Sequence, residues 1–210
     1  MNRYRKANCR SPRNSAEAGL SLLEVIVAIA ILTIVATASA TLSLTGIAAA
    51  ATQERLQVAV TVASSNMEII TATPVTDLYT GRWATNVSTA WTASSTAVGV
   101  GQTYQKSDPA GSSSSAETIP IHPTVPPQAG TTYTVTTLLG ACYQKITGGD
   151  CGKITGQAVA PAVPPAGYTD LVRAIVIVKW FAGKTCASGC TYVATTLIDP
   201  STNLTWVSHG

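Results

Sequence analysis

Charged side chains are scarce in this chain. Only 11% of its 210 residues are Asp, Glu, Lys or Arg, whereas 46% are hydrophobic. Residues 25–53 contain neither a charged residue nor a proline. So little charge is unusual for a cytosolic enzyme and is typical of a membrane or secreted protein.

Basic charge is concentrated at the N-terminal end of the chain. Of the 13 Lys and Arg residues, five precede residue 20, and of the 10 Asp and Glu residues only Glu17 does. Residues 20–210 therefore carry eight basic and nine acidic side chains, a net charge of −1. This nearly neutral body argues against a strongly basic nucleic-acid surface, so a nucleic-acid partner is not expected from the charge.

Patterns that would indicate catalysis are also missing. The two histidines, His122 and His209, have no Cys, Asp or Glu at ligand spacing, and no glycine-rich phosphate loop follows a strand. The acidic residues beyond residue 70 are scattered singly. The sequence therefore predicts no catalytic residue, no cofactor-binding residue and no metal ligand, and we expect the protein not to be an enzyme.

The most informative feature of the sequence is a long apolar segment that follows the basic N-terminal residues. Residues 25–47 would span about 35 Å as a helix, which is enough to cross a bilayer core of about 30 Å. Further on, Leu56, Val60, Ala63, Met67 and Ile70 recur at helical spacing and form an amphipathic stripe. Pro74 then marks a stop. We expect one helix over residues 20–73, with a transmembrane part at 20–52 and an amphipathic part at 53–73.

One carboxylate, Glu24, interrupts the start of this helix. Placing an ionised carboxylate in hydrocarbon costs about 2.5–3.5 kcal/mol, so an intramembrane acid indicates a function and needs a partner. A purely structural interpretation is that Glu24 reaches out to the membrane interface.

Two ordinary targeting interpretations compete for the same segment. A plain signal anchor explains the basic head but leaves the cost of Glu24 without a reason. A secretory signal is the stronger competitor, because Ala38, Ser39 and Ala40 resemble a small-residue cleavage site. Cleavage near Ala40 would release a surface binding protein that begins at Thr41.

Residues 18–32, AGLSLLEVIVAIAIL, resemble the N-terminal signature of type IV pilins and type II secretion pseudopilins. Gly19, Leu20, Ser21 and Glu24 fall on the positions of that signature. The family usually has Phe after the glycine, and Leu20 is a mild departure from it.

The resemblance implies how the chain is processed and what it does. A prepilin peptidase would remove residues 1–19 as a leader by cutting between Gly19 and Leu20, and would then methylate the new amine of Leu20. Glu24 would pair with that amine in a neighbouring subunit during assembly. The chain would be a structural subunit, more specifically a minor one, of a type IV pilus or a competence or secretion pseudopilus. It would be held in the inner membrane before it enters a fibre, and its partners would be the peptidase, other pilin subunits and the inner-membrane assembly machinery.

The remaining residues fall into two regions by composition. Residues 74–130 are rich in Ser, Thr, Pro and Gly, and we expect an irregular loop region with little power to form a core. Residues 131–210 are expected to form an antiparallel sheet, with strands at 131–139, 171–181, 191–198 and 204–207. Val172, Ala174, Val176, Val178 and Trp180 form an apolar face that should pack on the helix. The fold class is therefore α+β, a long N-terminal helix on a small antiparallel sheet, which also resembles pilins.

Four cysteines lie in the second of these regions: Cys142, Cys151, Cys186 and Cys190. In an exported domain, four cysteines indicate two disulfides with three possible connectivities. We favour the sequence-local pairing of Cys142 with Cys151 and of Cys186 with Cys190 over the crossed forms. A zinc site is the alternative, although the first spacing is long for one.

Overall fold

The computed structural model describes residues 21–182 and 186–200. Its elements are α1 (Leu22–Ala72), α2 (Ala84–Ala93), β1 (Tyr104–Gln105), β2 (Tyr133–Lys145), β3 (Tyr168–Ala182) and β4 (Cys186–Ile198). The chain divides into two compact units, 1–49 and 50–210, and the division falls inside α1. The described part of the first unit is helical apart from Ser21, and the second unit contains the sheet.

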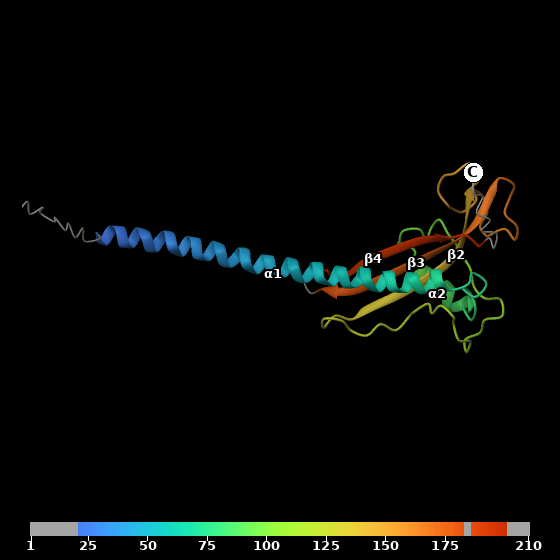
Figure 1. Ribbon diagram of the computed structural model, residues 1–210, viewed down its shortest axis with the longest axis horizontal. Coiled ribbons are helices and arrows are strands. Elements are labelled where there is room, and N and C mark those ends of the chain that lie inside the picture. The colour runs from blue at the N-terminus through green and yellow to red at the C-terminus, as the bar shows by residue number, and fades with distance from the viewer. Residues whose placement is uncertain (1–20, 183–185, 201–210) are drawn as a thin grey trace, which may run out of the picture. The chain divides into compact units, whose positions relative to one another are not determined.

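The second unit is built on one antiparallel sheet with the strand order β1-β2-β3-β4. The three long strands, β2, β3 and β4, are labelled in Figure 1. Val135 of β2 lies opposite Val178 of β3, and Val178 in turn lies opposite Tyr192 of β4. The expected α+β class is confirmed. β3 and β4 contain the expected strands 171–181 and 191–198 and extend beyond them at one or both ends. β2 begins two residues after the expected start at 131 and continues past the expected end at 139 to Lys145. The expected strand at 204–207 lies outside the described residues.

The second half of α1 covers one face of the sheet. Every second residue of β3 from Val172 to Trp180 is buried there in one cluster with residues of α1. This confirms the prediction from the β3 pattern. The stripe predicted on α1 is partly wrong, because Leu56 is 37% exposed, and the fully buried positions are Ala59, Val62, Ala63 and Ile70. The contact face of α1 therefore includes the small residues Ala59 and Ala63, and a pattern of large apolar residues does not identify it fully.

The other face of the sheet is covered by residues that were expected to be an irregular loop. Helix α2 lies within residues 74–130, and its Val87, Ala90 and Trp91 pack against Ile175 and Ile177 of β3. The expectation that this region has little power to form a core is therefore wrong. The spacing of three and then one residue places these three side chains on one helical face, but the surrounding Ser and Thr residues hide the pattern in the overall composition.

Candidate functional site: the N-terminal part of α1

Ser21 begins α1 as its N-terminal cap. Its side-chain Oγ accepts a hydrogen bond from the backbone N–H of Glu24 at 3.2 Å, and its carbonyl oxygen accepts from the same N–H at 2.9 Å. The N–H of Val25 also donates to the Ser21 carbonyl, at 3.2 Å. Because the first N–H groups of a helix have no intrahelical acceptor, Ser21 stabilises the start of the helix.

Glu24 lies in the first turn of this helix, and its side chain is exposed. Ser21 and Glu24 have the spacing of a capping box, in which the glutamate can return a hydrogen bond to the capping residue. Within the described part of the chain, only the bond from the Glu24 N–H to the Ser21 hydroxyl is formed, and the Glu24 carboxylate makes no hydrogen bond or ion pair. The partial positive charge of the helix N-terminus favours a carboxylate at this position.

The remainder of the first unit presents an apolar helical surface. All side chains from residue 22 to 49 are exposed, including Leu22, Ile29, Leu32, Leu42 and Ile47. By length and composition alone, α1 is able to cross a membrane. An exposed apolar surface of this length requires lipid or other apolar helices around it.

The Ser and Thr hydroxyls in this surface are hydrogen-bonded within the helix. Hydroxyls donate to backbone carbonyls three or four residues earlier, at 2.8–3.1 Å, from Thr33, Thr37, Ser39, Thr41, Ser43 and Thr45. A hydroxyl bonded in this way can enter an apolar environment without losing a hydrogen bond to water. The Ser and Thr content of the segment is therefore compatible with lipid or with a helix bundle.

Two of the predicted site residues cannot be placed. Gly19 and Leu20 lie outside the described residues, so the structure bears on neither the cleavage site nor the methylation site. In the second unit, Cys142 is bonded to Cys151 and Cys186 to Cys190, which is the sequence-local connectivity. These bonds leave no cysteine thiolate among these four for a zinc ion.

Arg82 is a buried residue that the sequence did not single out. Its side chain is 0% exposed, and its Nη1 and Nη2 donate to the carbonyl oxygens of Ile119 at 2.8 Å and Thr137 at 2.7 Å. Burial lowers the pKa of the guanidinium to about 10, against smaller opposing effects of Glu117 and Tyr79. Arg82 therefore ties the segment after α2 to the edge of β2 as a structural cation.

Arg173 has a similar role on β3. Its Nη1 donates to Thr103 Oγ1 at 3.0 Å, and its Nη2 donates to the carbonyl oxygen of Cys151. Burial lowers the pKa of Arg173, and Asp150 opposes this shift. Both arginines bind backbone or hydroxyl oxygens within the fold, an arrangement that fixes loops to the sheet and places no reactive group in a cavity.

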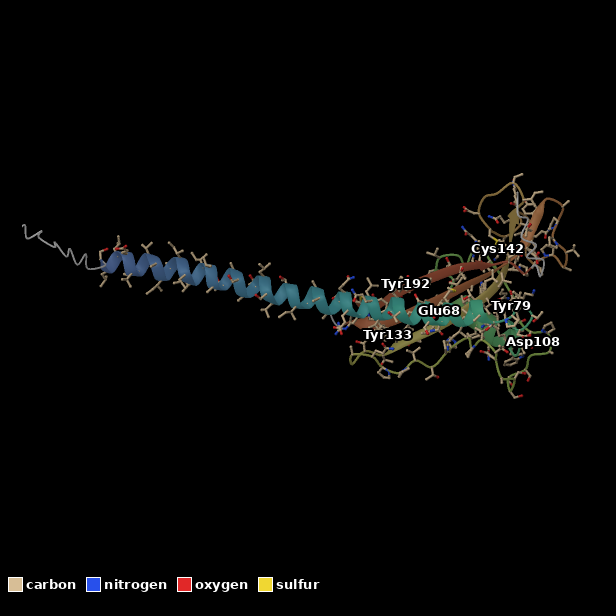
Figure 2. The ribbon with its side chains drawn as sticks, viewed as in Figure 1. Glu68, Tyr79, Asp108, Tyr133, Cys142 and Tyr192 are labelled. Atoms are coloured by element: carbon tan, nitrogen blue, oxygen red, sulfur yellow. A yellow bond between two sulfur atoms is a disulfide. The ribbon has the colours of Figure 1, made fainter. Side chains whose placement is uncertain are left out.

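Other groups with catalytic potential are dispersed. Across residues 21–182 and 186–200, no three His, Cys, Asp or Glu side chains come together as a metal site would need. Tyr79 and Asp108 lie in the second unit (Figure 2). Burial raises the pKa of Tyr79, and the N–H groups of Gly81 and Ala110 lower the pKa of Asp108. These shifts follow from local packing and turn hydrogen bonds.

Sequence reasoning missed the capping role of Ser21 and the core role of Arg82. A Ser-x-x-Glu pattern before an apolar run is a recognisable helix start, so the first was available from the sequence. The core role of Arg82 could not be predicted from the sequence, because a single arginine in a Ser- and Thr-rich segment gives no indication that its side chain is buried.

Residues 14–40 match the family model described as the prokaryotic N-terminal methylation motif. The match includes Gly19, Leu20, Ser21 and Glu24 and the first part of the apolar helix. No curated protein and no solved structure matches the chain. The motif, the long apolar helix and the antiparallel sheet support a similarity to the type IV pilin and pseudopilin family, and the matched residues are the N-terminal 14–40.

Proposed function

We propose that this protein is a minor structural subunit of a type IV pilus or of a related competence or secretion pseudopilus. A prepilin peptidase cuts between Gly19 and Leu20 and methylates the new amine of Leu20. The mature chain then begins at Leu20. The methylation motif at residues 14–40 is the observation that carries this proposal.

The localisation follows from the same segment. The motif and the long apolar helix fit anchoring in the inner membrane before assembly into a surface fibre or a pseudopilus. When a subunit leaves the membrane, its exposed apolar side chains between residues 22 and 49 lose their lipid contacts. Only apolar helices of other subunits can cover such a surface in a water-exposed fibre, so helix bundling is the means of assembly.

The role proposed for Glu24 is to pair with the amine of Leu20 in a neighbouring subunit. Two opposite charges about 4 Å apart attract by about 4 kcal/mol at an effective dielectric constant of about 20. This attraction offsets much of the cost of placing the two charges in hydrocarbon, about 2.5–3.5 kcal/mol for the carboxylate alone, whereas an unpaired carboxylate has no such compensation. Since the next charged residue along α1 is Glu54, the pairing also fixes the axial register between uncharged helices.

Substituting Glu24 by Gln separates charge from helix capping. Glutamine can still occupy the capping-box position, but it carries no charge. We expect both Glu24→Gln and Glu24→Ala to be cleaved and both to be depleted from sheared fibres. Glu68→Gln is the matched control, because Glu68 is an exposed acid on the second half of the same helix. Normal incorporation of Glu24→Gln would refute charge pairing and leave capping as the role of Glu24.

The N-terminus of the mature protein tests the processing step. Mass spectrometry of the purified protein should give N-methylated Leu20 as the first residue. A mature chain that begins at Thr41 would instead establish an ordinary secretory signal and contradict the proposal.

The choice of machine is tested by deletion of the gene. Loss of twitching, of DNA uptake or of protein secretion would each assign the subunit to a different machine.

The pilin subunits and the inner-membrane assembly machinery are the proposed partners, and the family is structural rather than enzymatic. Nucleic-acid binding follows only in a competence pilus, and a salt-dependent mobility-shift assay would detect it.

A further inference from the structure

One end of the sheet lies beside Arg55 of α1. Tyr133 is the first residue of β2, and its hydroxyl donates to the carbonyl oxygen of Arg55 at 3.2 Å. Tyr133 also pairs with Trp180, close to the end of β3. Figure 2 shows Tyr133 at this end of the second unit and Asp108 at the opposite end. We call the start of β2 and the end of β3 the Arg55 end of the sheet.

The Arg55 end lies at the level of a bilayer surface. The segment of α1 without charge ends at Gln53, and Arg55 is two residues further on, about 3 Å along the helix axis. The polar headgroup layer on each side of a bilayer core is about 5–7 Å thick. Residues 50–72 of α1 belong to the second unit, so this short distance is set within that unit. When the apolar part of α1 occupies the core, the Arg55 end is therefore level with the headgroups.

Phe181 is an exposed apolar side chain at this end. It is 73% exposed and lies between the buried residues Trp180 and Ala182, so it belongs to the face of the sheet that does not pack on α1. Gly189 of β4 is next to its ring and has no side chain to cover it. β3 runs antiparallel to β2, so Phe181 lies one residue, about 3.3 Å, beyond the level of Tyr133. Across the described residues, no Tyr or Trp side chain is as exposed as Phe181.

Basic side chains accompany Phe181. Lys179 is exposed and shares the face of Phe181, because the two residues are two positions apart on β3. Arg55 is half-buried, and the neighbouring Glu54 is an exposed acid. Bilayer interfaces favour an aromatic ring next to basic side chains, since the ring contacts the acyl boundary while the cations reach the phosphates.

We propose that Phe181 and Lys179 form a lipid-contact site while α1 holds the subunit in the inner membrane. The ring of Phe181 enters the interface, and the ammonium group of Lys179 binds a lipid phosphate. This contact orients the second unit on the membrane before assembly, a role separate from helix bundling in a fibre. Lipid is favoured over a second copy of the chain, because α1 keeps this end at the bilayer at every protein concentration.

Photocrosslinking identifies what contacts position 181. The phenylalanine analogue p-benzoylphenylalanine is placed at this position in the full chain, which is then reconstituted in vesicles of phosphatidylethanolamine and phosphatidylglycerol. Ile146 is the matched control position, because it is also 73% exposed but follows the far end of β2. We expect about tenfold more lipid adduct at 181 than at 146, the factor that burial of one Phe side chain supplies. Equal adduct at the two positions, or a crosslinked dimer in place of the lipid adduct, would overturn the proposal.

The acetylation rate of Lys179 tests the contribution of Phe181 without an analogue. In the same vesicles, a water-soluble reagent should modify Lys179 more slowly than Lys145, an exposed lysine at the far end of β2. Phe181→Ser should raise the ratio of the Lys179 rate to the Lys145 rate by a similar factor of about ten. Val163→Ser removes a 74% exposed apolar side chain elsewhere and should leave the ratio unchanged.

An unchanged ratio in Phe181→Ser, or the same rise in Val163→Ser, would contradict the lipid contact. Neither assay needs a fibre, so both results are independent of the proposed assembly function.

Discussion

Gly140 of β2 is a position at which one added methyl group should strongly disturb the packing of the second unit. A Cβ atom at this residue would lie 2.7 Å from Thr103 Cγ2 and 2.8 Å from the ring of Trp91, and closer still to the carbonyl oxygen of Tyr104. Gly140 also pairs with Gln105, so the contact lies where β1 meets the sheet. The absence of a side chain is what allows β1 and α2 to approach β2.

The expected cost of Gly140→Ala follows from these contacts. Carbon atoms in proteins rarely approach closer than about 3.5 Å, so the backbone at Tyr104 must move or Trp91 must change its position. Overpacking of this kind costs about 1–3 kcal/mol. Displacing Tyr104 also weakens the two-residue pairing of β1 with β2, at about 1 kcal/mol per hydrogen bond. We therefore expect the free energy of unfolding to fall by about 2–4 kcal/mol.

The assay is urea unfolding of the full chain in mild detergent, followed by tryptophan fluorescence. Gly152→Ala is the matched control, because a Cβ atom at Gly152 meets nothing within 4 Å. That change should be neutral or should stabilise the fold by about 0.4–1 kcal/mol, since alanine restricts the unfolded chain more than glycine does. If Gly140→Ala unfolds at the same urea concentration as Gly152→Ala, the close packing of β1, α2 and β2 is refuted.

Three further changes test buried groups of the second unit. The Tyr79 hydroxyl is buried without a hydrogen-bond partner among the described residues, so Tyr79→Phe should be neutral or stabilising by about 1 kcal/mol in urea unfolding at pH 7. Burial raises the pKa of Tyr79 in the folded chain, so the phenol ionises at a lower pH in the unfolded chain than in the folded one. The free energy of unfolding of the parent chain should therefore fall above pH 10. In Tyr79→Phe the contribution of this phenol to the fall should be absent. Arg82→Lys keeps the charge but cannot donate to the Ile119 and Thr137 carbonyls in the same planar geometry, so unfolding in urea should become easier by about 1–3 kcal/mol. Replacing Cys142 and Cys151 together by Ser opens a loop with a sequence separation of 9, and the melting temperature should fall in line with a loss of about 2–3 kcal/mol.

The sequence was sufficient for the elements with a strong period. β3 alternates apolar residues on one face, and the structure buries Val172, Ala174 and Val176 against α1 as this pattern predicts. Helix α1 likewise follows from a long segment free of charge and proline, with a stop at Pro74. The β3 pattern reflects burial directly, because the same side chains define the period and form the core.

The packing of helix α2 on the second face of the sheet could not be predicted from the sequence in the same way. Helix α2 is ten residues long and contains four Ser or Thr residues, in a region whose composition favours loops. Its burial depends on Ile175 and Ile177 of β3, which lie more than 80 residues further along the chain. Such a short helix gains its stability from tertiary packing, which a local pattern does not contain.

The start of α1 is compatible with the proposed assembly role of Glu24. The Ser21 hydroxyl and carbonyl already accept hydrogen bonds from the first N–H groups of the helix, so the helix start does not depend on the Glu24 side chain. The carboxylate therefore remains available to another group, and the exposed apolar helix around it offers no other charge before Glu54. A free carboxylate on a capped helix end is suited to bind an amine from outside its own subunit. If Glu24 were needed for capping instead, Gln would replace it without loss, and fibre incorporation of Glu24→Gln distinguishes the two roles.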